Sequence, residues 1–218
     1  MIAIIFALPN ESREFRRSLA ASSFASQVRV SHSGAGPAAA ARHVGRALAD
    51  RPEMLIATGF AGGLDPALRS GDIVIATNFS DSALIARARP RRSLHFGALT
   101  SVALPVESIA AKSTLARDTG AIAVDMETAP VAAACVRAGV PLLAARVISD
   151  PSGEALPVPF AEWFDLERQR PRPLRLLAFL ARQPAQIAPF ARFVRGLAPA
   201  RRALAEFLIS FLERSAAA

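Results

Sequence analysis

The sequence predicts an α/β fold, in which a mostly parallel mixed sheet is flanked by helices and followed by a helical C-terminal extension. Over the first 150 residues, short apolar runs alternate with alanine-rich segments of helical periodicity. Glycine turns follow several of these runs. From Pro151 onward, prolines and then helical segments rich in leucine, alanine and arginine replace the alternation. Residues 1–150 are therefore predicted to form the α/β core. Residues 151–218 are predicted to form a proline-rich linker and helices, within the same domain or as a peripheral appendage.

Each predicted element follows from a local pattern. Apolar runs bounded by turn residues predict strands at residues 2–8, 27–31, 54–58, 72–76, 99–104, 121–124 and 142–148. Helical periodicity predicts helices between them at residues 10–20, 37–49, 107–117 and 127–138. The polar, arginine-rich residues 78–95 are predicted to form a loop. Three further helices are expected at residues 174–182, 186–197 and 199–214.

The composition indicates the cellular compartment of the protein and excludes some classes of protein. With 218 residues, of which 52% are hydrophobic, the chain is long enough to bury a full core. A single cysteine, Cys135, excludes a disulfide framework and favours a reducing compartment. The sequence has no uninterrupted apolar stretch of about 18 residues. Its first apolar run lacks the basic segment of a signal peptide. We therefore expect a cytoplasmic protein, with the inner membrane surface as the alternative location.

The formal charge of +8 comes almost entirely from arginine, because Lys112 is the only lysine. Basic surfaces attract nucleic acid or anionic membranes. The chain contains no tyrosine and no nucleic-acid-reading motif, so we expect no nucleic-acid partner. The C-terminal helices have apolar and basic faces. They are expected either to pack on the sheet or to make peripheral contact with a membrane and admit a lipidic substrate.

Chemistry is expected where the predicted strands end, since ligands of open α/β sheets bind there. Acids and glycine turns follow five of the strands: Glu11, Ser33 to Gly36, Gly59 to Gly63, Asp125 to Glu127, and Ser149 with Asp150. Plainer roles stay open, because Glu11 and Glu127 would suit a helix N-terminus and Asp150 would suit a turn cap. The three histidines lack the spacing of a metal site, and we expect no metal.

These motifs, in this order, resemble the nucleoside phosphorylase superfamily, and in particular its methylthioadenosine/S-adenosylhomocysteine nucleosidase-like branch. The tail, with Ser149-Asp150-Pro151 and its Leu-Ala-Arg helices, is similar to the hopanoid-associated phosphorylases. The resemblance implies a homodimer with a nucleoside phosphorylase-like fold. It implies cleavage of the N-glycosidic bond of a 5′-modified adenine nucleoside, such as adenosylhopane, with release of adenine. No cofactor is implied, and the attacking group is inorganic phosphate or water. The alternatives are a methylthioadenosine/S-adenosylhomocysteine nucleosidase and a non-catalytic nucleoside-binding or membrane-peripheral protein.

The resemblance also implies a role for each site residue. Asp150 and Glu11 would be catalytic, one protonating the purine and the other orienting the nucleophile. The remaining residues would bind the ribose (Glu127, Met126), the base (Phe60, Ser149, Asp125), and the nucleophile or phosphate (Ser33, Gly34, Gly36, Gly59, Arg146).

Two residues depart from the family pattern. Ala57 stands where the phosphorylases have a phosphate-gripping arginine, which disfavours a standard phosphate site. Phe60 stands where the nucleosidases have a small hydroxyl residue, which disfavours a standard nucleosidase pocket. The segments near residues 21–28 and 78–98 are shorter than in those nucleosidases, so the pocket for the 5′-substituent is expected to be more open.

Overall fold

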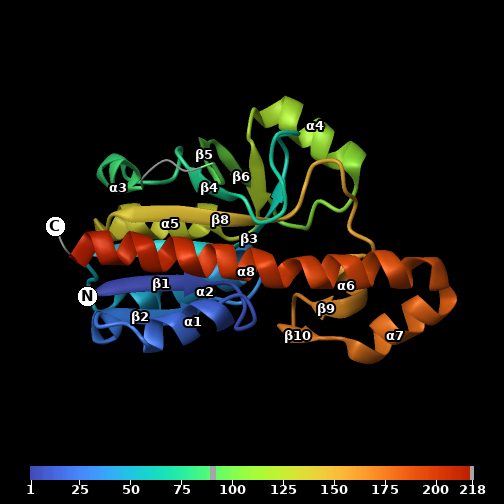
Figure 1. The fold of residues 1–218 in the computed structure, drawn as a ribbon, viewed down its shortest axis with the longest axis horizontal. Helices are drawn as coiled ribbons and strands as arrows, with labels where there is room; N and C mark the ends of the chain where they lie inside the picture. The colour runs from blue at the N-terminus through green and yellow to red at the C-terminus, as the bar shows by residue number, and fades with distance from the viewer. Residues whose placement is uncertain (89–91, 217–218) are drawn as a thin grey trace.

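A computed structural model describes residues 1–88 and 92–216 and contains the predicted mixed, mostly parallel sheet (Figure 1). The order β2-β1-β3-β8-β4-β5 forms its main path, and β7 pairs with both β3 and β6. Only the β4–β8 and β3–β7 pairs are antiparallel among the described strands of this sheet. Its strands are β1 (Ile2–Phe6), β2 (Val28–His32), β3 (Met54–Gly63), β4 (Ile73–Ala76), β5 (Leu94–Gly97), β6 (Leu99–Ser101), β7 (Ala123–Asp125) and β8 (Leu142–Asp150).

Helices cover both faces of the sheet because side chains alternate along each strand. The main helices are α1 (Arg13–Ala20), α2 (Pro37–Leu48), α3 (Ser82–Arg87), α4 (Ile109–Thr119), α5 (Thr128–Ala138), α7 (Pro173–Arg182) and α8 (Ile187–Ala216). Ile4 and Phe6 of β1 pack in one buried cluster with residues of α1 and α8. Ala3 and Ile5 of the same strand pack in another cluster, with residues of α2 and α5.

Strand β3 continues through the segment that the sequence analysis assigned to a glycine turn. Gly59 pairs with Arg146, and a shift in register after Ala61 pairs Gly62 with Asp150. A Cβ atom on Gly62 would lie 3.3 Å from Asp150 Oδ2 and 3.2 Å from Val124, so the absent side chain lets β7 and β8 approach closely. The longer strand brings residues far apart in sequence to one site.

The prediction of a loop at residues 78–95 is wrong for residues 82–87 and 94–95. The segment contains α3, whose first turn is capped by Asp81 through hydrogen bonds from the amides of Ala83 and Leu84. It also contains the start of β5, which pairs in parallel with β4. The part of the prediction that falls on residues 89–91 lies outside the described residues.

The prediction of two helices at residues 186–197 and 199–214 is also wrong, because α8 is one continuous helix with Pro199 inside it. A proline within a helix costs about 3 kcal/mol through a lost hydrogen bond and a steric clash. Burial of the following turns against the sheet offsets this cost: Ala200, Leu204, Phe207, Leu208 and Phe211 are at most 2% exposed.

The chain between β8 and the second half of α8 forms a group of small elements. It comprises α6 (Phe160–Trp163), a hairpin of β9 (Phe164–Asp165) and β10 (Arg170–Pro171), α7, and the first turns of α8. In Figure 1, α7 and those first turns extend beyond the ends of the central strands. No residue of α7 is buried. In the described ranges, no helix has the length and apolarity needed to cross a membrane.

Candidate functional site

A pocket lies beside the C-terminal parts of β3 and β8 and brings together most of the predicted site residues. Those that line it are Glu11, Phe60, Asp125, Met126, Glu127, Ser149 and Asp150. The predicted nucleophile or phosphate residues, namely Ser33, Gly34, Gly36, Gly59 and Arg146, are not among its lining residues. Glu11, Asp125, Glu127 and Asp150 form the polar part of the lining, here called the floor. The glycine turn and Arg146 bind residues of this floor, through the bond from Gly36 to Glu127 and the ion pair with Asp125.

Asp150 is the last residue of β8, and two side chains hold its carboxylate. Its Oδ2 lies 2.6 Å from Nζ of Lys112. Its Oδ1 accepts a hydrogen bond of 2.5 Å from Ser149 Oγ. Both oxygens thus bind side chains rather than the backbone amides that a turn cap would use. Burial raises the pKa of Asp150, and the ion pair with Lys112 opposes part of that rise.

Lys112 contacts the site, and the sequence analysis did not include it among the site residues. It lies on α4 with no exposed surface. The sequence held one sign that Lys112 is unusual. It is the only lysine, whereas the other basic residues, apart from the histidines, are all arginine.

Glu127 occupies the N-cap position of α5, but its side chain makes no capping hydrogen bond. Its Oε1 instead accepts a hydrogen bond of 2.6 Å from the amide of Gly36, which joins the glycine turn to the start of α5. Burial raises the pKa of Glu127 to about 7, against the opposing effect of Arg146. Met126 lies beside the same turn, since a Cβ on Gly36 would be 3.5 Å from its methyl carbon.

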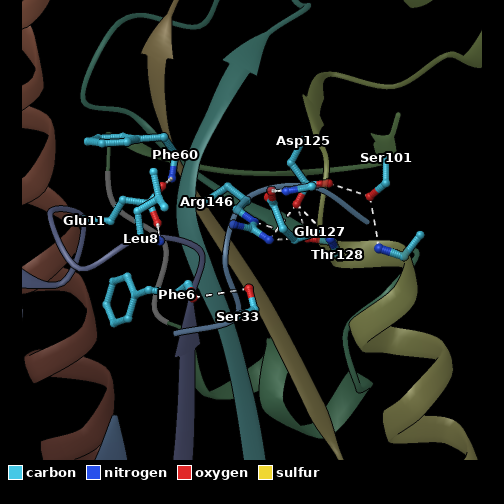
Figure 2. A network of polar contacts seen from close by, with 12 residues as sticks. Phe6, Leu8, Glu11, Ser33, Phe60, Ser101, Asp125, Glu127, Thr128 and Arg146 are labelled. Carbon is cyan, nitrogen blue, oxygen red and sulfur yellow. Dashed lines mark hydrogen bonds and ion pairs between the residues drawn. The ribbon is translucent and has the colours of Figure 1, made fainter. Parts of the chain in front are cut away.

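Glu11 precedes α1 and points into the site (Figure 2). Its carboxylate accepts hydrogen bonds from the amides of Leu8 at 2.9 Å and Phe60 at 3.3 Å. These bonds fix the acid between the end of β1 and the glycine-rich part of β3. Burial raises the pKa of Glu11, although these amides and Arg146 oppose the shift.

A cation inside an apolar strand is costly without an anionic partner, and Asp125 is the partner of Arg146. Nη2 of Arg146 lies 2.6 Å from Asp125 Oδ2. Thr128 Oγ1 accepts from Nε and Nη2 of the arginine and donates to Asp125 (Figure 2). Ser101 donates to the other oxygen of Asp125. The carboxylate of Asp125 is thus occupied by three side chains, and its contact with the base stays a prediction.

The turn from Ser33 to Gly36 binds other parts of the chain. The Ser33 hydroxyl donates to the carbonyl of Gly34 at 2.9 Å. Gln169, between β9 and β10, binds Ala35 twice: its Oε1 accepts from the amide at 2.7 Å and its Nε2 donates to the carbonyl at 2.8 Å. The amides of Ala35 and Gly36 therefore face Gln169 and Glu127.

The mouth of the pocket is apolar. Phe160 and Trp163 of α6 contribute to it, with ring centroids 4.5 Å apart in an edge-to-face arrangement. Phe193 and Leu197 from the first half of α8 lie on the same mouth. The sequence analysis assigned none of these four residues to the site, because Phe160 and Trp163 fall in the predicted linker and Phe193 and Leu197 fall in a predicted amphipathic helix.

Over residues 1–88 and 92–216, no group of three or more His, Cys, Asp or Glu side chains is placed to hold a metal ion.

Comparisons with known proteins identify the family. The family model of the phosphorylase superfamily matches residues 7–87 and 79–180. A 5′-methylthioadenosine/S-adenosylhomocysteine nucleosidase from Exiguobacterium is 27% identical over 147 residues. The match covers 53% of this chain and 63% of that relative's length.

Solved structures share the fold. A futalosine hydrolase mutant of Helicobacter pylori has a TM-score of 0.70 at 19% identity, with 97% of this chain and 98% of that chain covered. A 5′-methylthioadenosine/S-adenosylhomocysteine nucleosidase from S. pneumoniae has a TM-score of 0.69 at 21% identity, with 97% of each chain covered. At these identities the likeness establishes the fold alone. Because the family model spans most of the chain, this protein belongs to the phosphorylase superfamily.

Proposed function

We propose that the enzyme cleaves the N-glycosidic bond of a 5′-modified adenine nucleoside and releases adenine. One observation carries the proposal: Glu11, Glu127 and Asp150, three buried acids from separate elements, line one pocket whose mouth is apolar. The polar floor suits a purine and a ribose, and the apolar mouth suits the 5′-substituent. The name of the curated relative, a nucleosidase of two adenosine derivatives, supports the same reaction class.

Asp150 is assigned to the purine. As the bond between N9 and C1′ breaks, its electron pair moves into the base, and a proton from Asp150 to N7 makes adenine a better leaving group. An acid in this role must hold its proton near neutral pH. The burial that raises the pKa of Asp150 supports this role.

Glu127 and Met126 are assigned to the ribose. A carboxylate that accepts hydrogen bonds from two sugar hydroxyls makes charge-assisted contacts, and its charge stabilises the positive charge that develops at C1′. The bond from Gly36 holds one oxygen of Glu127 in a fixed position.

Glu11 is assigned to the attacking group, which is water or inorganic phosphate. The backbone bonds from Leu8 and Phe60 orient its carboxylate. Arg146 is a buried cation near this part of the site. Because it is paired with Asp125, it does not decide between water and phosphate as the nucleophile. Ser33, Gly34, Gly36 and Gly59 do not line the described pocket, and we assign them to the same position from the family resemblance alone.

The apolar mouth favours a large 5′-substituent, and we assign an adenosylhopane-like nucleoside as the substrate. Phe160, Trp163, Phe193 and Leu197 provide aromatic and aliphatic surface there. A methylthio group covers little of such a surface, so methylthioadenosine is the second candidate substrate.

Adenine release from purified protein tests the proposal. Adenosylhopane, methylthioadenosine and S-adenosylhomocysteine are incubated separately, with and without phosphate, and free adenine is measured by chromatography. We expect fastest release from adenosylhopane. A ribose 1-phosphate product indicates phosphorolysis, and the free sugar indicates hydrolysis. D150N should lose about 10²–10⁴-fold in rate. Absence of adenine from all three nucleosides contradicts the proposal. Nucleoside binding without turnover would instead support a non-catalytic binding protein.

We also propose that the hairpin of α7 and the first half of α8, residues 173–199, contacts an anionic membrane surface. The segment contains four arginines and no acidic residue. Leu174 and Leu177 are 82% and 65% exposed, and Ile187 and Val194 are also exposed. Exposed apolar side chains among cations suit the interface of an anionic bilayer. Such a location would bring a lipidic substrate to the pocket mouth.

Vesicle sedimentation tests the membrane contact. We expect the protein to sediment with phosphatidylglycerol vesicles more than with phosphatidylcholine vesicles. L174S/L177S should weaken this binding. V136S is a matched control because Val136 is 81% exposed on α5. Equal sedimentation with both vesicle types, or equal effects of the two variants, contradicts the proposal. The homodimer implied by the family resemblance is a separate proposal, and sedimentation velocity tests it.

A further inference from the structure

Lys112 is a buried cation with no part in the chemistry described above. Its side chain is fully inaccessible, and an ammonium group in a protein interior is costly unless oxygen atoms surround it. Four oxygens do so. The Asp150 carboxylate lies at 2.6 Å, and the carbonyls of Asp150, Pro151 and Glu154 lie at 3.1, 2.9 and 2.8 Å.

These contacts fix the end of β8. Because three of the four oxygens belong to backbone between Asp150 and Glu154, Nζ of Lys112 fastens the chain as it leaves the strand. The fourth contact holds one carboxylate oxygen, while Ser149 holds the other. The orientation of the Asp150 side chain toward the pocket is thus set from both of its oxygens.

We propose that Lys112 is a positioning residue, which aims the Asp150 carboxyl group at the purine and stabilises the carboxylate left when its proton passes to N7. The inference rests on the proposed function. In this step the O–H bond of Asp150 breaks and an N–H bond forms at N7. The electron pair that remains on the carboxylate faces the ammonium group, and Lys112 itself gives up no proton.

The charges around Asp150 determine what loss of the cation would do. Burial and the neighbouring Glu154 raise the pKa of Asp150, whereas Lys112 and Ser149 lower it. Without Lys112 the pKa rises further, so Asp150 keeps its proton to higher pH and releases it less readily. The basic limb of the pH profile should therefore move upward while the maximal rate falls.

The pH dependence of kcat/KM for adenine release tests this inference. In K112M we expect kcat to fall about tenfold or more and the basic limb to move up by about one to three pH units. K112R, which keeps the cation, should keep the limb near its wild-type position. R117M is the control on the same helix, at an exposed arginine, and should leave the profile unchanged. A K112M profile with an unmoved basic limb overturns the inference.

A second measurement uses the unaltered chain and does not depend on K112M folding. Because Lys112 is the only lysine, labelling with [¹⁵N]lysine gives a single Nζ resonance. We expect D150N to shift this resonance, and adenine binding to the wild type to shift it as well. A resonance that neither change moves overturns the inference. Failure of the wild type to release adenine, by contrast, counts against the proposed function, and the resonance still reports on the ion pair.

Discussion

Arg146 and Asp125 form an ion pair of 2.6 Å in which the side chains are only 2% and 1% exposed. The pair joins the middle of β8 to the end of β7, and Thr128 at the start of α5 bonds both partners. Arg146, which the family resemblance assigns to the nucleophile, therefore also links three elements of the fold, namely β7, β8 and α5.

Breaking this pair from one side should destabilise the fold. R146M leaves the Asp125 carboxylate buried without its cation, and we expect the free energy of unfolding to fall by about 3–5 kcal/mol. Urea unfolding at pH 7 measures the loss. The double variant D125N/R146M removes the uncompensated charge as well and should recover part of the stability. A loss below about 1 kcal/mol in R146M would contradict a buried, unscreened pair.

Glu127 should make stability fall as pH rises. Its pKa is about 7 in the folded protein and near 4.5 when unperturbed. The folded state thus holds a proton that the unfolded state has lost between these two values. The contribution of Glu127 to the free energy of unfolding is fully present below about pH 4.5 and is lost as the pH rises through 7. At about 1.4 kcal/mol per pH unit, the loss is on the order of 3 kcal/mol.

E127Q isolates that contribution because glutamine does not titrate. The difference in unfolding free energy between wild type and E127Q should change between pH 4.5 and pH 8 in the direction given above. A difference that stays constant with pH would show that Glu127 is ionised throughout this range.

Gly34 and Gly36 provide a matched pair for the role of Gln169. Both have positive φ, +85° and +88°, so alanine is strained at either position by about 1–3 kcal/mol. A Cβ on Gly34 would also lie 2.7 Å from Gln169 Oε1, while one on Gly36 meets nothing closer than 3.5 Å. G34A should therefore destabilise the protein more than G36A.

A double-mutant cycle assigns the extra cost of G34A. In a Q169A background the cost of G34A should fall by about 0.5–3 kcal/mol, while that of G36A stays the same. Thermal unfolding of the six proteins measures both differences. An unchanged cost of G34A would mean that Gln169 moves away without loss, and that the β9–β10 hairpin is not fixed on the turn.

The sequence predicted the sheet and the acids at its edge because both have local signals. Apolar runs marked β1 and β8, and Glu11, Glu127 and Asp150 stood at the ends of such runs. The partners of these acids had no local signal. Lys112 lies 38 residues from Asp150 along the chain, and Gln169 lies 134 residues from Ala35. Only the tertiary fold brings such pairs together.

The errors in the prediction have a related cause. The glycines of β3 have low strand propensity, but pairing with β7 and β8 on either side overrides it. Pro199 is a strong local stop signal, but burial of the helix that follows it overrides that signal. In both cases a tertiary contact with the sheet overrides a local signal.

Pro199 allows a direct measure of that competition. It lies inside α8 and its side chain is exposed, so alanine creates no cavity. P199A restores a helical N–H donor and removes a clash worth about 3 kcal/mol in total. It also gives the unfolded chain more freedom, which costs about 0.4–1 kcal/mol. We expect the free energy of unfolding, measured with a chemical denaturant, to rise by about 2 kcal/mol. P173A is the control, because a proline at the first position of α7 breaks no helical hydrogen bond, and it should leave stability unchanged or slightly lower. Equal responses of P199A and P173A would mean that α8 adapts to its proline at no cost, and that burial of its second half has no penalty to overcome.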